Sequence, residues 1–134
     1  MSETPHAAAA AIAGRLTAAW NAGDCHAFVA PFAPDADFIN IFGLHLRGRQ
    51  PIADQHAFIF RGIYLGSHAR FEVIDARALT PDVIHAVLSS RVAVPAGPMA
   101  GTVATIMNLV LVHAAGAWHI AAFHNTKIAP PPGG

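Results

Sequence analysis

Charge is scarce in this chain. Charged residues make up 12% of its 134 residues, about half of the roughly 25% that an ordinary soluble domain carries. The eight basic and eight acidic residues cancel, so there is no basic surplus to neutralise phosphates. We therefore expect neither nucleic acid nor an anionic membrane as a partner.

The chain also has only one cysteine and few long apolar runs. The single cysteine, Cys25, cannot form an intrachain disulfide, which fits a reducing compartment, and we expect a cytoplasmic protein. The apolar stretch 103–112 is interrupted by Thr105 and Asn108, short of the roughly 18 residues that suggest a membrane span. The Ala-rich N-terminus has no positively charged region before it, so we interpret it as a helix rather than a signal peptide.

Motifs for cofactors and metals are missing as well. No G-x-G-x-x-G follows a predicted strand, so we expect no dinucleotide and no other cofactor. The nine histidines form no helical H-x-x-x-H pair. His119 and His124 lie five residues apart on a predicted strand and point to opposite faces, so we expect no metal site. Cys25 stands at a helix start without a matched base, which favours a structural role.

What the chain does have is an excess of apolar residues. They make up 54% of the sequence, against roughly 45–50% in a typical domain. The length predicts one domain over residues 1–134, with an ordered core from about 5 to 128 and a tail over 129–134. The excess indicates an internal cavity, a self-association face, or both, and we expect both.

The first part of the chain predicts two helices. Thr4 is placed to cap a helix that begins at Pro5, and Gly23 is placed to end it. Asp24 caps a second, short helix, which we expect to include Phe32 before a turn at Pro34 and Asp35.

A strand and a third helix follow. The strand is predicted over residues 36–43, with Asn40 on the same side as its phenylalanines. Gly48 then introduces a helix that runs to about Phe60. His56 falls within the apolar stripe of this helix, the face that should meet the rest of the protein.

In the second half of the chain, apolar residues recur at every second position. Tight connections at 80–82 and 115–116 predict an antiparallel meander of strands near 68–79, 83–94, 102–113 and 117–127. Both faces of the last strands are apolar, unlike an antiparallel sheet with one solvated face. We therefore expect the outer sheet face to pack against a second copy in a homodimer.

His56 and Asn40 are the first candidates for chemistry. A histidine in an apolar stripe can act as acid or base near neutral pH, because burial lowers its pKa and a neighbouring carboxylate raises it. The alternative is a core histidine with one hydrogen bond. Asn40 could orient a ligand carbonyl or hydroxyl, or could satisfy a loop backbone. Asp37 lies on the opposite strand face and is interpreted as an exposed carboxylate.

Two further candidates lie on predicted strands. Arg91 could bind a carboxylate or enolate oxygen, or could extend into solvent from the sheet. Asn125 and His124 point to opposite faces of the last strand, so at most one of them shares a pocket with Phe123. The pattern leaves open which one does.

Four segments resemble one known family. They are AWNAGD at 19–24, FAPDADF at 32–38, RGR at 47–49 followed by Ile52 and His56, and WHIAAFHNT at 118–126. In this order they resemble the SnoaL-like branch of the nuclear transport factor 2-like superfamily, and more narrowly its SgcJ/EcaC-type group. The resemblance spans about residues 7 to 128.

The resemblance implies an α+β fold, a cone-shaped and strongly curved antiparallel sheet covered by three N-terminal helices. It also implies a pocket at the open end and usually a homodimer. The superfamily includes ketosteroid isomerases, polyketide cyclases, dehydratases, hydrolases and non-catalytic members, and the narrower group is often labelled oxidoreductase. Its isomerases and cyclases use a carboxylate base. This sequence directs no carboxylate clearly into the cavity, so His56 becomes the substitute candidate.

Together these patterns predict a small-molecule pocket protein that performs isomerase-, cyclase- or dehydratase-type proton transfer on a small, largely apolar metabolite. His56 would move the proton, Asn40 and Asn125 would hold an oxygen, and Arg91 would stabilise negative charge. The predicted walls are Trp20, Phe38, Phe58, Tyr64, Met107 and Phe123. The alternatives are a ligand-binding module without chemistry and a domain that only oligomerises.

Overall fold

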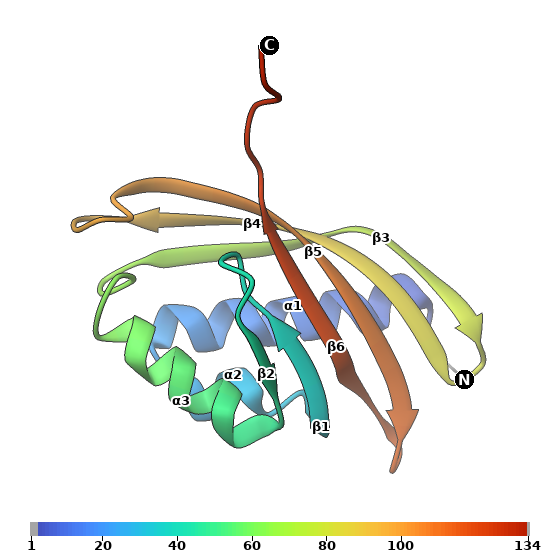
Figure 1. The fold of residues 1–134 in the computed structure, drawn as a ribbon. Coiled ribbons are helices and arrows are strands. Elements are labelled where there is room, and N and C mark those ends of the chain that lie inside the picture. The colour runs from blue at the N-terminus through green and yellow to red at the C-terminus, as the bar shows by residue number, and fades with distance from the viewer. Residues whose placement is uncertain (1–2, 134) are drawn as a thin grey trace.

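The computed structural model describes residues 3–133. Three helices and six strands follow in the order α1 (Pro5–Ala22), α2 (Cys25–Val29), β1 (Phe32–Ile39), β2 (His45–Arg47), α3 (Arg49–Phe60), β3 (His68–Thr80), β4 (Val83–Val94), β5 (Gly101–Ala114) and β6 (Ala117–Lys127). The strands form a single sheet in the order β2-β1-β6-β5-β4-β3. The sheet is strongly curved and the helices lie along one of its sides (Figure 1). The predicted α+β architecture is confirmed.

The ends of the first two helices follow from their capping residues. The Thr4 hydroxyl accepts a hydrogen bond from the Ala7 N–H at 3.1 Å, and Gly23 ends α1 in the left-handed region with φ 64°. The Asp24 carboxylate accepts from the Ala27 N–H at 3.0 Å. These side chains satisfy backbone groups that helix ends leave unpaired, and the predicted starts of both helices are confirmed.

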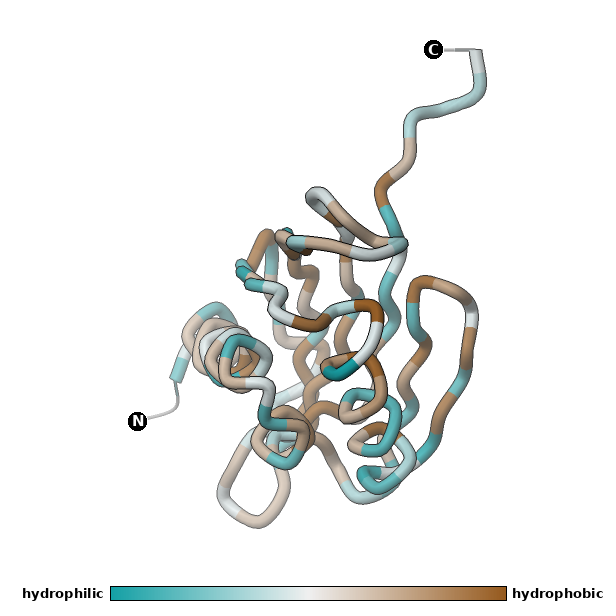
Figure 2. The backbone as a smooth tube through the Cα atoms, turned by 90° about the vertical axis from the view of Figure 1, so that its left-hand side faces the viewer, coloured by the Kyte–Doolittle hydropathy of each residue, from teal (hydrophilic) through white to brown (hydrophobic). Residues whose placement is uncertain are grey.

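Strands β3 to β6 form the predicted antiparallel meander, with bounds within a residue of those expected. Residues alternate between the two sheet faces. On β4 the inner face carries Ile84, Ala86 and Leu88, each 0–1% exposed. Apolar residues recur along the strands, and the segment after β6 extends away from the body (Figure 2).

The second helix is shorter than predicted. It ends at Val29, and Phe32 begins β1 instead of continuing the helix. The reason is a pairing between distant segments: β1 lies parallel to β6, and the Ile120 N–H donates to the Pro31 carbonyl oxygen at 2.8 Å. The periodicity of the sequence cannot predict a pairing between two segments that lie far apart in the chain.

The first strand also ends earlier than predicted, at Ile39 rather than Gly43. The Asn40 side-chain oxygen accepts hydrogen bonds from the Phe42 and Leu44 N–H groups, both at 2.9 Å. This closes a turn, because an asparagine side chain can stand in for a backbone acceptor. The chain then returns as the short antiparallel strand β2, which the sequence analysis did not predict.

Within residues 3–133, no helix combines the length and the apolarity that crossing a bilayer requires.

Candidate functional site

A cavity of about 240 Å³ lies between α3, the C-terminal end of α1 and the ends of β1 and β6. This volume is just below the roughly 300–1,000 Å³ of sites for drug-sized ligands. Its apolar walls are Trp20, Phe38, Ile41, Phe42, Phe58, Ile59, Ile63 and Tyr64, and its polar residues are Asn40, Gln55, His56 and Asn125. The cavity therefore suits a small molecule of one or two rings.

Most of the predicted site residues meet at this cavity. The structure brings together Trp20, Phe38, Asn40, His56, Phe58, Tyr64 and Asn125. It also decides between the two faces of β6, because Asn125 lines the cavity whereas His124 is exposed.

Two predicted wall residues lie behind the walls. Met107 and Phe123 are 1% and 3% exposed and belong to the core. The Phe123 ring stacks on Phe38 with centroids 4.6 Å apart and an angle of 15° between the planes. They therefore support the lining residues and are not among them.

Arg91 does not line the cavity, which corrects the prediction that it stabilises negative charge there. It is exposed, and its neighbours across β4 are Arg70 on β3 and Ala104 on β5. The residues on either side of it, Ser90 and Val92, are buried on the inner face. Because strand residues alternate, Arg91 must point outward, as in the solvent-exposed alternative.

The sequence analysis missed several lining residues. Ile59 follows His56 by three positions on α3, so the helical period could have identified it. Gln55 borders the same face. Ile41, Phe42 and Ile63 lie in turns, where no period predicts the direction of a side chain.

His56 is held rigidly in the wall of the cavity. Its ring stacks on Phe28, with centroids 4.2 Å apart and planes 26° apart, and meets Phe38 edge-on at 5.1 Å. The Nδ1–H donates to the Ile52 carbonyl oxygen at 2.7 Å. A carbonyl can only accept, so this contact places the proton on Nδ1 and leaves the Nε2 lone pair free when the ring is neutral.

Burial keeps this imidazole neutral. The side chain is 2% exposed, and desolvation lowers the pKa of His56 from 6.5 to about 4, against a smaller opposing effect of the Ile52 carbonyl. Among the described residues that line the cavity there is no Asp, Glu, Lys or Arg. The site therefore presents His56 as a neutral hydrogen-bond acceptor at neutral pH.

Asn40 and Asn125 both line the cavity. Phe38 pairs with Phe123 across β1 and β6. Asn125 follows Phe123 by two residues on the same face of β6, and Asn40 follows Phe38 by two residues in the turn after β1. The Asn40 oxygen is used by the turn, so its amide N–H groups are what it can offer a ligand. The Asn125 side-chain oxygen is buried and has no hydrogen-bond partner among the described residues.

Asp37 lies away from this cavity, as its strand position predicts. Its Oδ1 accepts from His45 Nε2 at 2.7 Å and from Arg47 Nε at 2.9 Å. The hydrogen bond from His45 and, to a smaller extent, the one from Arg47 lower the pKa of Asp37. The carboxylate holds β2 against β1 and is not a base for the cavity.

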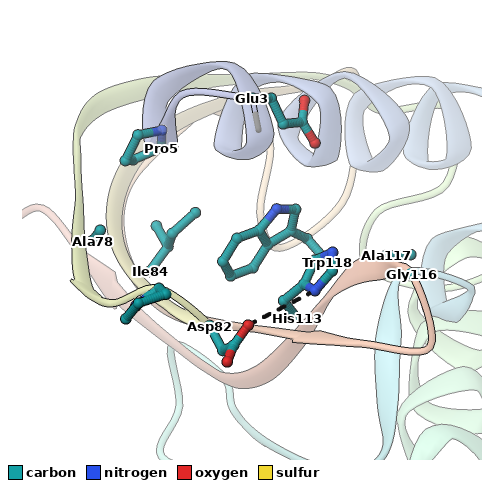
Figure 3. Close-up of a pocket in the computed structure, with 10 residues that line it drawn as sticks. Glu3, Pro5, Ala78, Asp82, Ile84, His113, Gly116, Ala117 and Trp118 are labelled. Carbon is teal, nitrogen blue, oxygen red and sulfur yellow. Dashed lines mark ion pairs between the residues drawn. The ribbon is translucent and has the colours of Figure 1, made fainter. Parts of the chain in front are cut away.

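A larger hollow of about 1,020 Å³ lies at the other end of the sheet (Figure 3). Trp118 lies between Glu3 and Pro5 above and a contact of 3.9 Å between His113 Nδ1 and Asp82 Oδ1 below. Exposed charged side chains border it, so water competes for its polar groups. We assign the functional site to the smaller cavity because its lining is largely apolar and uncharged.

Over residues 3–133, no group of three or more His, Cys, Asp or Glu side chains is arranged to hold a metal ion.

A family model for the SnoaL-like domain matches residues 9–129. The chain belongs to the SnoaL-like domain family. None of the functionally curated proteins matches it.

Solved structures share the fold of this SnoaL-like domain. A domain of unknown function with a cystatin-like fold from Nostoc punctiforme has a TM-score of 0.86 at 27% identity, covering 97% of this chain and 81% of that one. A ketosteroid isomerase-like protein from Erwinia carotovora has a TM-score of 0.79 at 18% identity, covering 96% and 100%. A hexachlorocyclohexane dehydrochlorinase from Novosphingobium barchaimii has a TM-score of 0.80 at 9% identity, covering 95% and 90%. The last two likenesses concern the fold alone.

The buried imidazole should make this SnoaL-like domain less stable in acid. In the unfolded chain His56 takes up a proton as the pH falls through 6.5, whereas in the folded protein it stays neutral down to about 4. The unfolded state then binds more protons, so acidification favours unfolding, and the free energy of unfolding should fall by about 2 kcal/mol between pH 7 and pH 5. Urea denaturation at the two pH values measures this loss.

Two variants isolate this contribution. Between pH 7 and pH 5, the unfolding free energy of His56→Phe should fall by about 2 kcal/mol less than that of wild type. His124→Phe, at an exposed position, should keep the pH dependence of the wild type. An equal loss in His56→Phe and wild type would contradict the assigned burial of a neutral ring.

Proposed function

We propose that this SnoaL-like domain binds a small, neutral, largely apolar molecule in the cavity between α3 and the ends of β1 and β6. The observation that carries the proposal is the Asn125 amide, whose oxygen is buried without a hydrogen-bond partner among the described residues, in a largely apolar wall. Burying an unpaired acceptor costs about 1–3 kcal/mol. A bound molecule with a hydrogen-bonding group would give this amide a partner and recover part of that cost.

The neutrality of the ligand is inferred from the lining. No formal charge faces the cavity from its lining residues, so an ion would lose its hydration without gaining a counter-charge. Five aromatic side chains, Trp20, Phe38, Phe42, Phe58 and Tyr64, line the cavity and favour a ring-containing ligand. Shape and apolar contact would then supply affinity, and the few polar groups would orient the molecule.

Filling the cavity should abolish binding. Naphthalene is a neutral two-ring probe, and isothermal titration calorimetry measures its affinity. Ile63→Trp places a large ring in the cavity lining and should weaken binding at least tenfold. Ile74→Trp is the matched control, since Ile74 is 57% exposed on β3, and should bind as wild type does. Equal affinity in both variants would refute the assignment, provided that both retain the wild-type circular dichroism spectrum.

Proton transfer of the isomerase, cyclase or dehydratase type is our second candidate. It is favoured by the free Nε2 lone pair of His56, which is fixed in a dry wall by the Ile52 contact. A base held in place and shielded from water can take a proton from a bound molecule. The isomerase-like and dehydrochlorinase neighbours add only an analogy of fold.

Isotope exchange tests this candidate. 2-Tetralone is a neutral two-ring ketone with acidic C–H bonds beside the carbonyl. In deuterated buffer at pH 7 the wild type should accelerate its deuterium uptake, as followed by proton NMR. His56→Phe should lower the rate to that of buffer, because the accepting nitrogen is gone, while His124→Phe should behave as wild type. No acceleration by the wild type would eliminate this candidate and leave binding alone.

We further propose a family subgroup and a cellular location for this chain. The order of the four sequence segments supports the SgcJ/EcaC-type group within the family, and the single cysteine supports a reducing, cytoplasmic location. The oxidoreductase label of that group would apply to this chain by resemblance alone.

We also propose that the outer sheet face pairs with a second copy of the chain. Ile106 is 41% exposed at the centre of β5, and Val110 and Val112 are half-buried on the same face. Exposed apolar patches on a sheet are typical of interfaces, and a two-fold dimer is the default arrangement.

A charge at the centre of this face should separate the copies. Ile106→Glu should shift the mass measured by analytical ultracentrifugation from dimer to monomer, because the carboxylate would be buried without a partner. Leu65→Glu is the control in the loop after α3, where Leu65 is 63% exposed, and should remain dimeric. A wild type that sediments as a monomer would refute the dimer.

A further inference from the structure

Some polar groups at the cavity are already hydrogen-bonded within the protein and cannot bind a ligand. Trp20 does not offer its indole N–H, because this group donates to the Ser67 hydroxyl at 2.9 Å. Asn40 does not offer its oxygen, because that atom accepts from two backbone N–H groups of the turn. The groups left for a ligand are the N–H groups of Asn40, the Tyr64 hydroxyl, the Gln55 and Asn125 amides and His56 Nε2.

Two of these groups are restricted to a single role: the Asn40 N–H groups donate and His56 Nε2 accepts. The Gln55 and Asn125 amides and the Tyr64 phenol can each donate or accept, or can turn to exchange the two roles. The imidazole is held in one orientation. A flip of the ring would put Cδ2 in place of Nδ1 and remove the 2.7 Å hydrogen bond to the Ile52 carbonyl, and the ring is stacked on Phe28.

Protonation does not reverse this role at neutral pH. With the pKa of His56 lowered to about 4, about one ring in a thousand carries a second proton at pH 7. A carbonyl or ether oxygen placed opposite Nε2 would therefore meet a lone pair. Both acceptors would lose their water and gain no hydrogen bond.

Resting on the proposed function, we infer that the ligand presents a hydroxyl or an N–H group to His56 Nε2 from a neutral, mainly apolar ring system. The ligand class is thus a small phenol, alicyclic alcohol or N–H heterocycle. A ketone or ether can occupy the same cavity only with its oxygen turned away from His56, toward the donors of Asn40 or Tyr64.

Matched probes test the inference. 2-Naphthol, 2-methoxynaphthalene and naphthalene share one ring system, and only the first carries a donor. At pH 7, calorimetry on the wild type should give at least tenfold tighter binding for 2-naphthol than for 2-methoxynaphthalene, about the effect of one buried hydrogen bond. Equal affinity for the two would overturn the inference and leave the proposed function intact. No binding of any probe would overturn both.

A variant assigns the preference to one atom. His56→Phe keeps a ring in the aromatic cluster but removes the acceptor, so the ratio of its affinities for 2-naphthol and 2-methoxynaphthalene should fall to about one. His124→Phe should keep the preference. A preference that survives in His56→Phe would assign it to another group and refute our inference.

A spectroscopic measurement on the wild type covers the case in which His56→Phe does not fold. In protein labelled with ¹⁵N-histidine, neutral His56 has one pyridine-like nitrogen, Nε2. Its resonance should move upfield when 2-naphthol binds and stay in place with naphthalene. Saturation with 2-naphthol without that shift would show that the hydroxyl does not reach His56.

Discussion

The parallel pairing of β1 with β6 is the constraint on which the rest of this structure depends. It joins the segment after α2 to the last strand of the meander, starting from the hydrogen bond between the Ile120 N–H and the Pro31 carbonyl. It sets Phe38 against Phe123 and so brings the ends of β1 and β6, with Asn40 and Asn125, to the same cavity. Without this pairing, Asn40 and Asn125 would not be brought to the same cavity.

The second determinant of the site is the burial of one imidazole among aromatic rings. Burial alone would leave open which nitrogen carries the proton. The Ile52 carbonyl, one helical turn earlier on α3, decides it by accepting from Nδ1. Desolvation then keeps the ring neutral. The helix therefore determines both the position and the chemical role of His56, with no help from a carboxylate.

This arrangement explains why the fold alone says little about activity. The domain shares its architecture with an isomerase-like protein and a dehydrochlorinase, yet function depends on the few groups that line the cavity. The described lining residues include no carboxylate, and Asp37 is engaged with His45 and Arg47 elsewhere. Their polar groups are the neutral His56 imidazole, three amides and the Tyr64 hydroxyl.

The sequence by itself determined the local structure: Thr4, Gly23 and Asp24 mark helix ends, and the period of two marks β3 to β6, because these signals act between neighbouring residues. It also predicted His56 within an apolar face. Only the tertiary structure decided that Phe32 starts a strand, that Asn125 rather than His124 lines the cavity, and that Arg91 faces solvent. Alternation states which residues share a face, but which face encloses the cavity depends on the side of the sheet where the helices pack. That choice rests on contacts between segments far apart in the chain, and no local pattern records it.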